Sequence, residues 1–124
     1  RYVKPNGLAN VPVISGDLPI PVITLHTIGD LFVPFSMQQI YAQRAAAQGK
    51  SDLLVQRAIR DVGHCYFTPV EEWEAFTDLV NWVENGVKPA GDDILDPENV
   101  ADPCFGCNFT RTDRDFGPYS APCP

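Results

Sequence analysis

The pattern of hydrophobic and polar positions predicts two strands, each followed by a helix. A β-branched apolar run from Pro21 to His26, preceded by prolines and followed by Gly29-Asp30, predicts a buried strand. Leu53 to Ile59 predicts a second strand, although polar side chains interrupt it. Between them, apolar residues recur at helical spacing after the capping pair Ser36 and Gln39, and Gly49 ends that helix.

The second helix has the strongest start signal in the chain. Thr68-Pro69-Val70-Glu71 combines an N-cap residue, a proline at the first helical position and a carboxylate that can return to the cap. Gly86 and Pro89 end this helix. We expect its aromatic residues to pack against the sheet and its early glutamates to form a solvated first turn. The aromatic residues are Trp73, Phe76 and Trp82, and the glutamates are Glu71, Glu72 and Glu74.

The order of these elements indicates an α/β fold. A crossover of about thirty residues between the strands favours parallel pairing in a right-handed unit. Two parallel strands do not form a stable sheet by themselves, because such strands need cover on both faces and neighbours at their edges. We therefore expect this chain to supply one part of a larger sheet.

Size and charge exclude several classes of function. The chain has 124 residues, and its net charge of -7 is the wrong sign for binding a nucleic acid backbone. Its longest apolar stretch is well short of the roughly 20 residues that cross a bilayer. Because the first residue is Arg1 and not methionine, we expect a processed or cut chain with further polypeptide upstream.

The composition changes near residue 88. Residues 89–124 hold six of the 12 prolines and three of the 4 cysteines, and they show no periodicity. We therefore divide the chain into a segment of residues 1–88 and an irregular, acidic tail of residues 89–124 that wraps a surface. An even number of cysteines favours disulfides, with three pairings open, and indicates a secreted or periplasmic protein. Cys104, Cys107 and Cys123 lack the fourth ligand of a structural zinc site, so we expect no metal.

Two residues that could carry chemistry follow the predicted strands. Asp30 follows the first strand and His64 follows the second. Functional groups in parallel sheets gather beyond the carboxyl ends of the strands, and adjacent strands lie about 4.8 Å apart. We therefore expect this carboxylate and this imidazole to meet as an orienting acid and a general base. His26, at the end of the first strand, is interpreted as a hydrogen-bonded structural residue.

With these residues in place, the sequence resembles the C-terminal part of an α/β-hydrolase. The resemblance covers residues 12–88 and rests on the segment from Pro21 to Asp30, on Val33-Pro34, and on Gly63-His64 ahead of the second helix. In that family the acid and then the histidine follow late strands, in the order nucleophile, acid, base. The resemblance implies that Asp30 is the triad acid and His64 the triad base, in the C-terminal portion of a parallel sheet with flanking helices.

The chain lacks the family's nucleophile. No Gly-x-Ser-x-Gly elbow is present, because none of the serines has such neighbours, and the glycine-rich oxyanion-hole segment is absent too. The serines are Ser15, Ser36, Ser51 and Ser120. We expect both parts to come from an upstream segment or a companion chain. Cys65 is set aside as a nucleophile, because adjacent side chains in an extended loop point apart.

These observations lead to two hypotheses. In the first, the chain is the C-terminal part of a serine hydrolase that cleaves small carboxylic esters, or amides, without a cofactor. His64 takes the proton of the serine hydroxyl and returns it to the leaving group, while Asp30 stays ionised. In the second, the chain is a non-catalytic binding or structural module with a disulfide-pinned tail.

Overall fold

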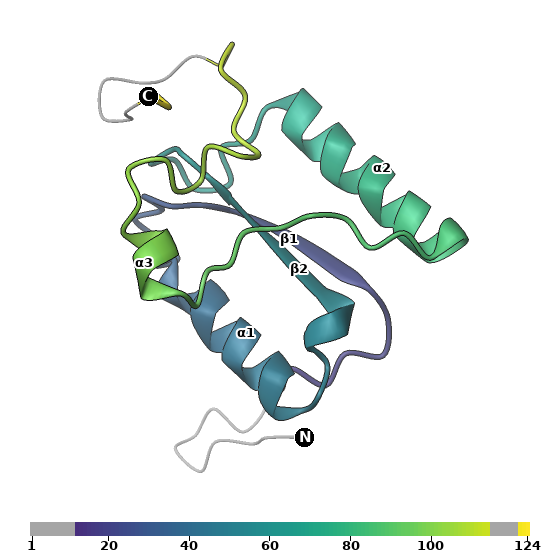
Figure 1. Cartoon of the computed structure of the whole chain (residues 1–124). Helices are drawn as coiled ribbons and strands as arrows, with labels where there is room; N and C mark the ends of the chain where they lie inside the picture. The colour runs from purple at the N-terminus through teal and green to yellow at the C-terminus, as the bar shows by residue number, and fades with distance from the viewer. Residues whose placement is uncertain (1–11, 115–121) are drawn as a thin grey trace.

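The computed structural model describes residues 12–114 and 122–124, so Ser120 lies outside the described residues. Along the chain the order is strand β1, helix α1, a short 3-10 turn, strand β2, helix α2 and helix α3 (Figure 1). The bounds are β1 Val22–Thr27, α1 Ser36–Ala47, the turn Ser51–Leu53, β2 Leu54–Ile59, α2 Pro69–Asn85 and α3 Pro97–Val100.

Strands β1 and β2 pair in parallel, as the sequence predicts. Val22 lies opposite Leu54, and the register continues without a break to Thr27 opposite Ile59. Parallel pairing needs a crossover, and α1 provides it. The two strands therefore end at the same edge, which brings the loops after Thr27 and Ile59 together. Within the described part of the chain the sheet has these two strands, and its extension by further strands stays a prediction.

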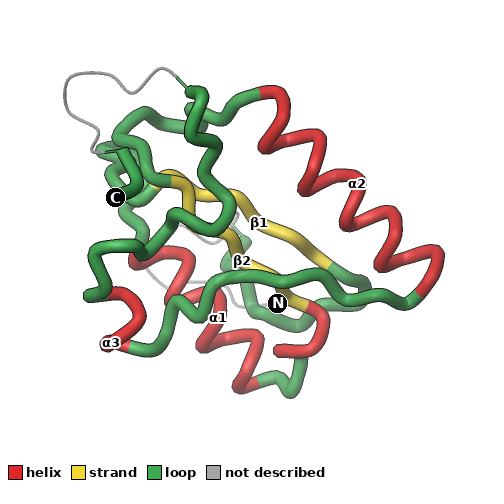
Figure 2. Tube along the Cα trace, turned by 45° about the horizontal axis from the view of Figure 1, so that its top comes forward, coloured by secondary structure: helices red, strands yellow, loops and turns green. Residues whose placement is uncertain are grey.

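The two long helices cover opposite faces of the strand pair (Figure 2). Successive residues of a strand point to opposite faces, and two neighbours in β2 show this directly. Gln56 Nε2 donates to Gln38 Oε1 of α1 at 2.8 Å. Arg57, the next residue, forms an ion pair with Asp78 of α2. The pair is therefore enclosed from both sides, as buried parallel strands require.

Helix α2 begins as predicted, whereas α1 begins differently. The Thr68 hydroxyl accepts from Glu71 N at 3.2 Å and Glu71 Oε2 accepts from Thr68 N at 2.7 Å, which completes the capping box. Gly86 ends α2 with φ of 72°. In α1 the predicted capping pair is wrong, because Phe35 is the N-cap residue and makes no side-chain cap. Gln39 Nε2 instead donates to Ile94 O in the tail at 2.9 Å.

The predicted packing face of α2 is also wrong. Trp82 is buried as expected, but the side of α2 that bears Trp73 and Phe76 faces solvent, and these two residues are 67% and 58% exposed. Their rings contact one another, with centroids 6.3 Å apart. The buried side of α2 carries Glu71 and Ala75 with Trp82. The expectation of a solvated first turn therefore fails at Glu71.

The tail packs on the strand pair and completes the core on the α1 side. Asp92 N donates to Gln56 O at 2.8 Å, so the chain after α2 returns alongside β2. Farther on, Ile94 and Phe105 form a buried cluster with Ala58 of β2. Figure 1 shows the chain between α2 and α3 passing over the strands. Burial of these apolar side chains stabilises the packing of the tail against β2.

One of the expected disulfides is present. Cys107 and Cys123 are bonded, with their Cα atoms 5.6 Å apart, whereas Cys65 and Cys104 are free and exposed. Over the residues that the structure describes, no helix is long and apolar enough to cross a membrane. In the same part of the chain, no group of three or more potential ligand side chains could hold a metal ion.

Candidate active site

The Asp30 side chain lies buried in the turn that follows β1. The Asp30 Oδ1 atom accepts hydrogen bonds from Phe32 N at 2.8 Å and from Val33 N at 3.0 Å. These bonds fix the carboxylate within its own turn and leave Oδ2 directed away from it. The side chain is 3% exposed. A buried carboxylate needs such partners, because an unpaired charge away from water is costly.

His64 is the partner of the remaining Asp30 oxygen. Its Nδ1 atom lies 2.7 Å from Asp30 Oδ2. The structure thus brings together the two residues that the sequence singled out. An ionised carboxylate only accepts hydrogen bonds, so Nδ1 is the donor, and a neutral ring then has a free electron pair on Nε2. With the His64 side chain 45% exposed, the ring is open to an incoming group.

The environment of Asp30 keeps this carboxylate ionised. Burial raises its pKa, but the hydrogen bond from Val33 N–H, the bond from the His64 ring, the bond from Phe32 N–H and the charge of His64 together outweigh it. The net result lowers the pKa from 3.8 to about 2. Asp30 is therefore negative at neutral pH and can both orient the imidazole and stabilise its protonated form.

The acid loop and the histidine loop pack directly on one another. Gly29 N donates to Asp61 O at 2.8 Å, and Ile28 N donates to Ile59 O at 2.9 Å. A Cβ atom at Gly29 would lie 2.7 Å from a methyl group of Val62. Glycine is therefore needed at this position, because a side chain would push the two loops apart.

The geometry corrects the interpretation of Cys65. Its Sγ atom lies 3.8 Å from His64 Nε2, so the two neighbouring side chains do not point apart. Cys65 has a φ of 51°, in the left-handed region that a non-glycine residue rarely adopts. This backbone conformation accounts for the failure of the extended-loop argument. Cys65 is a free thiol beside the open nitrogen of the imidazole.

No serine stands at that nitrogen within the described residues. In residues 12–114 and 122–124 the polar contacts of His64 are with Asp30 and Cys65. An aromatic ring also borders the imidazole, since the centroids of Phe32 and His64 are 5.5 Å apart. The other histidine, His26, is buried at the end of β1, and its Nδ1 donates to Thr27 O at 2.8 Å. This contact confirms that His26 is a hydrogen-bonded residue.

Sequence reasoning missed the polar cluster that lies beside the histidine loop. Asp61, Glu71 and Arg114 are all buried, and Arg114 forms an ion pair with each of the two carboxylates. The capping box was a usable signal for Glu71, since it directs that carboxylate toward the backbone at the start of α2. Nothing in the sequence around Arg114 marks it, because the tail has no periodicity.

Comparison with known proteins gives one partial similarity. An o-phthalyl amidase from Xanthobacter agilis is 31% identical over 77 residues, which are 62% of this chain. The chain spans 17% of the length of that curated relative. No protein-family model matches the sequence, and no solved structure matches the chain. The similarity supports a hydrolytic function in general terms and specifies neither a type of hydrolase nor a scissile bond.

Proposed function

We propose that this chain supplies the acid and the base of a serine hydrolase of the α/β-hydrolase type, and that the enzyme cleaves carboxylic esters or amides. The observation that carries the proposal is the 2.7 Å contact between Asp30 Oδ2 and His64 Nδ1. It leaves Nε2 of a partly exposed ring as the base. In a catalytic triad the acid bonds to one ring nitrogen of the histidine in this way, and the other ring nitrogen acts as the base.

In the proposed mechanism, His64 Nε2 takes the proton from a serine hydroxyl as its oxygen attacks the carbonyl carbon. The imidazolium then gives this proton to the departing alkoxide or amine, and an acyl-enzyme remains. A water molecule, activated by the same nitrogen, releases the acid. Asp30 stays ionised throughout, in keeping with its pKa of about 2. The similarity to a protein named as an amidase is the reason for including amides among the proposed substrates.

The serine and the oxyanion hole would come from polypeptide outside this chain. Two features of the described residues support such a partner. The paired strands leave the second edge of β1 without a strand. The face of α2 with Val70, Trp73, Phe76 and Val83 is exposed. Large contiguous apolar surfaces are rarely left uncovered in soluble proteins, and Trp73 and Phe76 contact one another on this face. A further strand beside β1 would pair with its second edge, and a further helix would cover the exposed face of α2.

A fluorophosphonate probe tests this function in the complete enzyme. We expect the probe to label a serine outside the 124 residues, as located by peptide mass spectrometry. His64→Gln should abolish both labelling and turnover of an anilide and the matching phenyl ester, whereas Cys104→Ser, a change at an exposed free cysteine, should alter neither. Turnover that survives His64→Gln would refute the assignment, and a protein without any labelled serine would support the binding-module hypothesis.

A further inference from the structure

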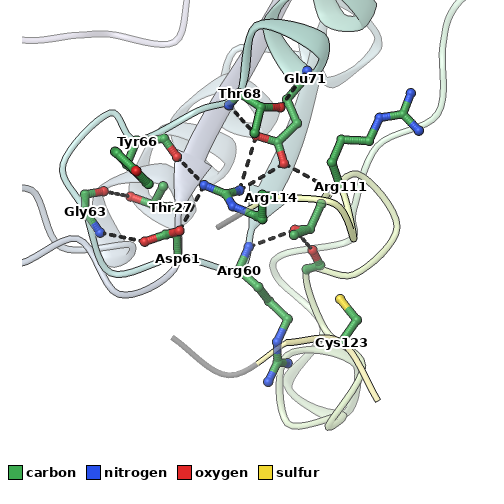
Figure 3. A network of polar contacts seen from close by, with 12 residues as sticks. Thr27, Arg60, Asp61, Gly63, Tyr66, Thr68, Glu71, Arg111, Arg114 and Cys123 are labelled. Carbon is green, nitrogen blue, oxygen red and sulfur yellow. Dashed lines mark hydrogen bonds and ion pairs between the residues drawn. The ribbon is translucent and has the colours of Figure 1, made fainter. Parts of the chain in front are cut away.

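The tail places one arginine inside the fold, next to the histidine loop. Arg114 Nη1 donates to both oxygens of Glu71, at 2.9 and 3.2 Å. Nη2 donates to Tyr66 O at 2.6 Å and lies 2.9 Å from Asp61 Oδ2. Figure 3 shows the guanidinium between these three partners. The side chains of Arg114, Glu71 and Asp61 are 1%, 0% and 4% exposed, so the cluster is closed to solvent.

These partners stand on both sides of His64 in the chain. Asp61 and Tyr66 flank the loop that carries His64, and Glu71 anchors the first turn of α2, into which this loop leads. Asp61 also holds the loop from within, because its Oδ1 accepts from Val62 N at 2.6 Å and from Gly63 N at 3.1 Å. A single guanidinium therefore fixes the beginning and the end of the loop at once.

The chemistry of this cluster suits positioning. Guanidinium is planar and offers donors in a rigid fork, so it sets the direction of each partner, whereas a lysine ammonium acts as a point charge. Taking several charges out of water is costly, and replacing such a cluster by apolar side chains often leaves stability unchanged or improved. The cluster therefore serves to fix the geometry of the loop that carries His64.

The tail is attached so that Arg114 reaches this place. The Thr110 hydroxyl accepts from Arg60 N, just after β2, at 2.8 Å. Arg111 N donates to Glu71 Oε1 at 2.8 Å. The disulfide between Cys107 and Cys123 closes the stretch of chain that contains Arg114. The end of β2, the start of α2 and the tail thus meet around the guanidinium (Figure 3).

We propose that Arg114 is a positioning residue for His64: it holds the loop from Asp61 to Tyr66 so that the imidazole meets Asp30 and presents Nε2 to the nucleophile. This inference rests on the proposed function, since it assigns the tail a part in the same reaction. Its role is indirect, because it acts through the loop and contributes no proton to the chemistry.

The test compares two arginines of the tail in the complete enzyme. Arg114→Ala should lower kcat by roughly 10- to 100-fold with little change in KM, because a small misplacement of a catalytic group has effects of this size. Arg111→Ala is the matched control, since the Arg111 side chain pairs with Glu74 at the surface. Its kcat should stay within about two-fold of the parent. Guanidinium chloride at millimolar concentration should restore part of the kcat of Arg114→Ala, while sodium chloride should not.

A spectroscopic readout separates positioning from general stability. The ¹⁵N shifts of the His64 ring report which nitrogen is protonated, and in Arg114→Ala we expect them to lose the fixed Nδ1–H form. Normal kcat and normal ring shifts in a folded Arg114→Ala would overturn this inference alone, provided that His64→Gln is inactive. An active His64→Gln would overturn the proposed function instead.

A conservative variant covers the case in which Arg114→Ala does not fold. Arg114→Lys keeps the charge and loses the fork, and we expect a folded protein with reduced kcat and altered ring shifts. Full activity with unchanged shifts in Arg114→Lys would overturn the inference. If both variants fail to fold, the arginine is structural and the inference is also overturned.

Discussion

Thr27 and Gly63 join the acid loop to the histidine loop through one hydrogen bond. The Thr27 hydroxyl, at the end of β1, donates to Gly63 O at 2.6 Å. Thr27 is almost completely buried. Gly63 directly precedes His64, so this bond fixes the backbone next to the imidazole relative to the end of β1.

Removing this hydroxyl should therefore affect both stability and activity. Thr27→Val leaves Gly63 O unsatisfied, and we expect the free energy of unfolding to fall by about 1–3 kcal/mol and kcat to fall with it. Thr27→Ser keeps the donor and should retain most activity. Thr24→Val is the control, because the Thr24 hydroxyl donates to Gln38 on the α1 side. It should lower stability, measured by urea unfolding, without a matching loss of kcat.

The lowered pKa of Asp30 predicts how stability depends on pH. The folded-state value of about 2 lies below the ordinary 3.8, so ionised Asp30 stabilises the folded state fully above pH 3.8. That stabilisation is lost as the pH falls through about 2. Urea unfolding of the parent and of Asp30→Asn should differ most at and above about pH 4 and converge toward pH 2. A difference that stays constant over this range would contradict the assignment.

The exposed aspartate Asp52 provides the control for this measurement. Asp52 belongs to the turn before β2 and its side chain is fully exposed, so Asp52→Asn is the matched control for the loss of an aspartate carboxylate. The same pKa also predicts that protonation of Asp30 does not cause a loss of activity between pH 4 and 7. A loss of activity in that range therefore reports on a group other than Asp30.

Cys65 offers a direct test of where the nucleophile resides. Its thiol lies beside His64 Nε2, but in the proposed mechanism that nitrogen serves a serine from elsewhere. Cys65→Ser should therefore keep kcat within a few-fold of the parent. Iodoacetamide should inhibit the parent by placing a bulky group at the imidazole, and it should not inhibit Cys65→Ser. A loss of all turnover in Cys65→Ala would identify Cys65 as the nucleophile.

The disulfide should stabilise the tail measurably. In the chain-entropy account, closing a loop of about 15 residues contributes about 3 kcal/mol. The separation between Cys107 and Cys123 is 16 residues. We expect Cys107→Ser with Cys123→Ser to lower the free energy of unfolding by about this amount. Cys104→Ser is the control, because Cys104 is exposed and unbonded, and it should have no effect. Equal losses in both variants would show that the bond contributes little.

The exposed face of α2 predicts a contact in the complete protein. Trp73→Gln and Phe76→Gln should destabilise it, by about 2 kcal/mol for Phe76 if that side chain becomes fully buried. Glu84→Gln, at an exposed position on the same helix, is the control. Differential scanning calorimetry measures the difference. If neither aromatic substitution changes the melting temperature, this face stays in solvent in the complete protein.

Local signals in the sequence account for the elements that could be predicted. The β-branched run of β1 and the capping box of α2 depend on neighbouring residues alone, so they are recognisable without the fold. The meeting of Asp30 with His64 followed from parallel pairing, which places both loops at one edge. These predictions needed no knowledge of the tail.

The failures arise where tertiary contacts override local preference. Glu71 was expected in solvent, but Arg114, from a distant part of the chain, buries it. With Glu71 on the inner side of α2, Trp73 must point outward. The predicted Ser36 cap is wrong because Phe35 is the N-cap residue of α1, and the Gln39 side chain bonds to the tail at Ile94. The errors at Glu71 and Trp73 depend on a contact with another element, which periodicity in a single sequence does not encode, whereas the error at Cys65 comes from its left-handed backbone conformation.

The second edge of β1 also has a practical consequence. In the described part of the chain, β1 pairs through one edge with β2, and a strand edge with free backbone N–H and C=O groups is a template for any other extended chain. Produced without the proposed partner, the segment should therefore associate with further copies through Val22–Thr27 and precipitate. Co-expression with the polypeptide that is proposed to carry the nucleophile should instead give soluble material for biochemistry.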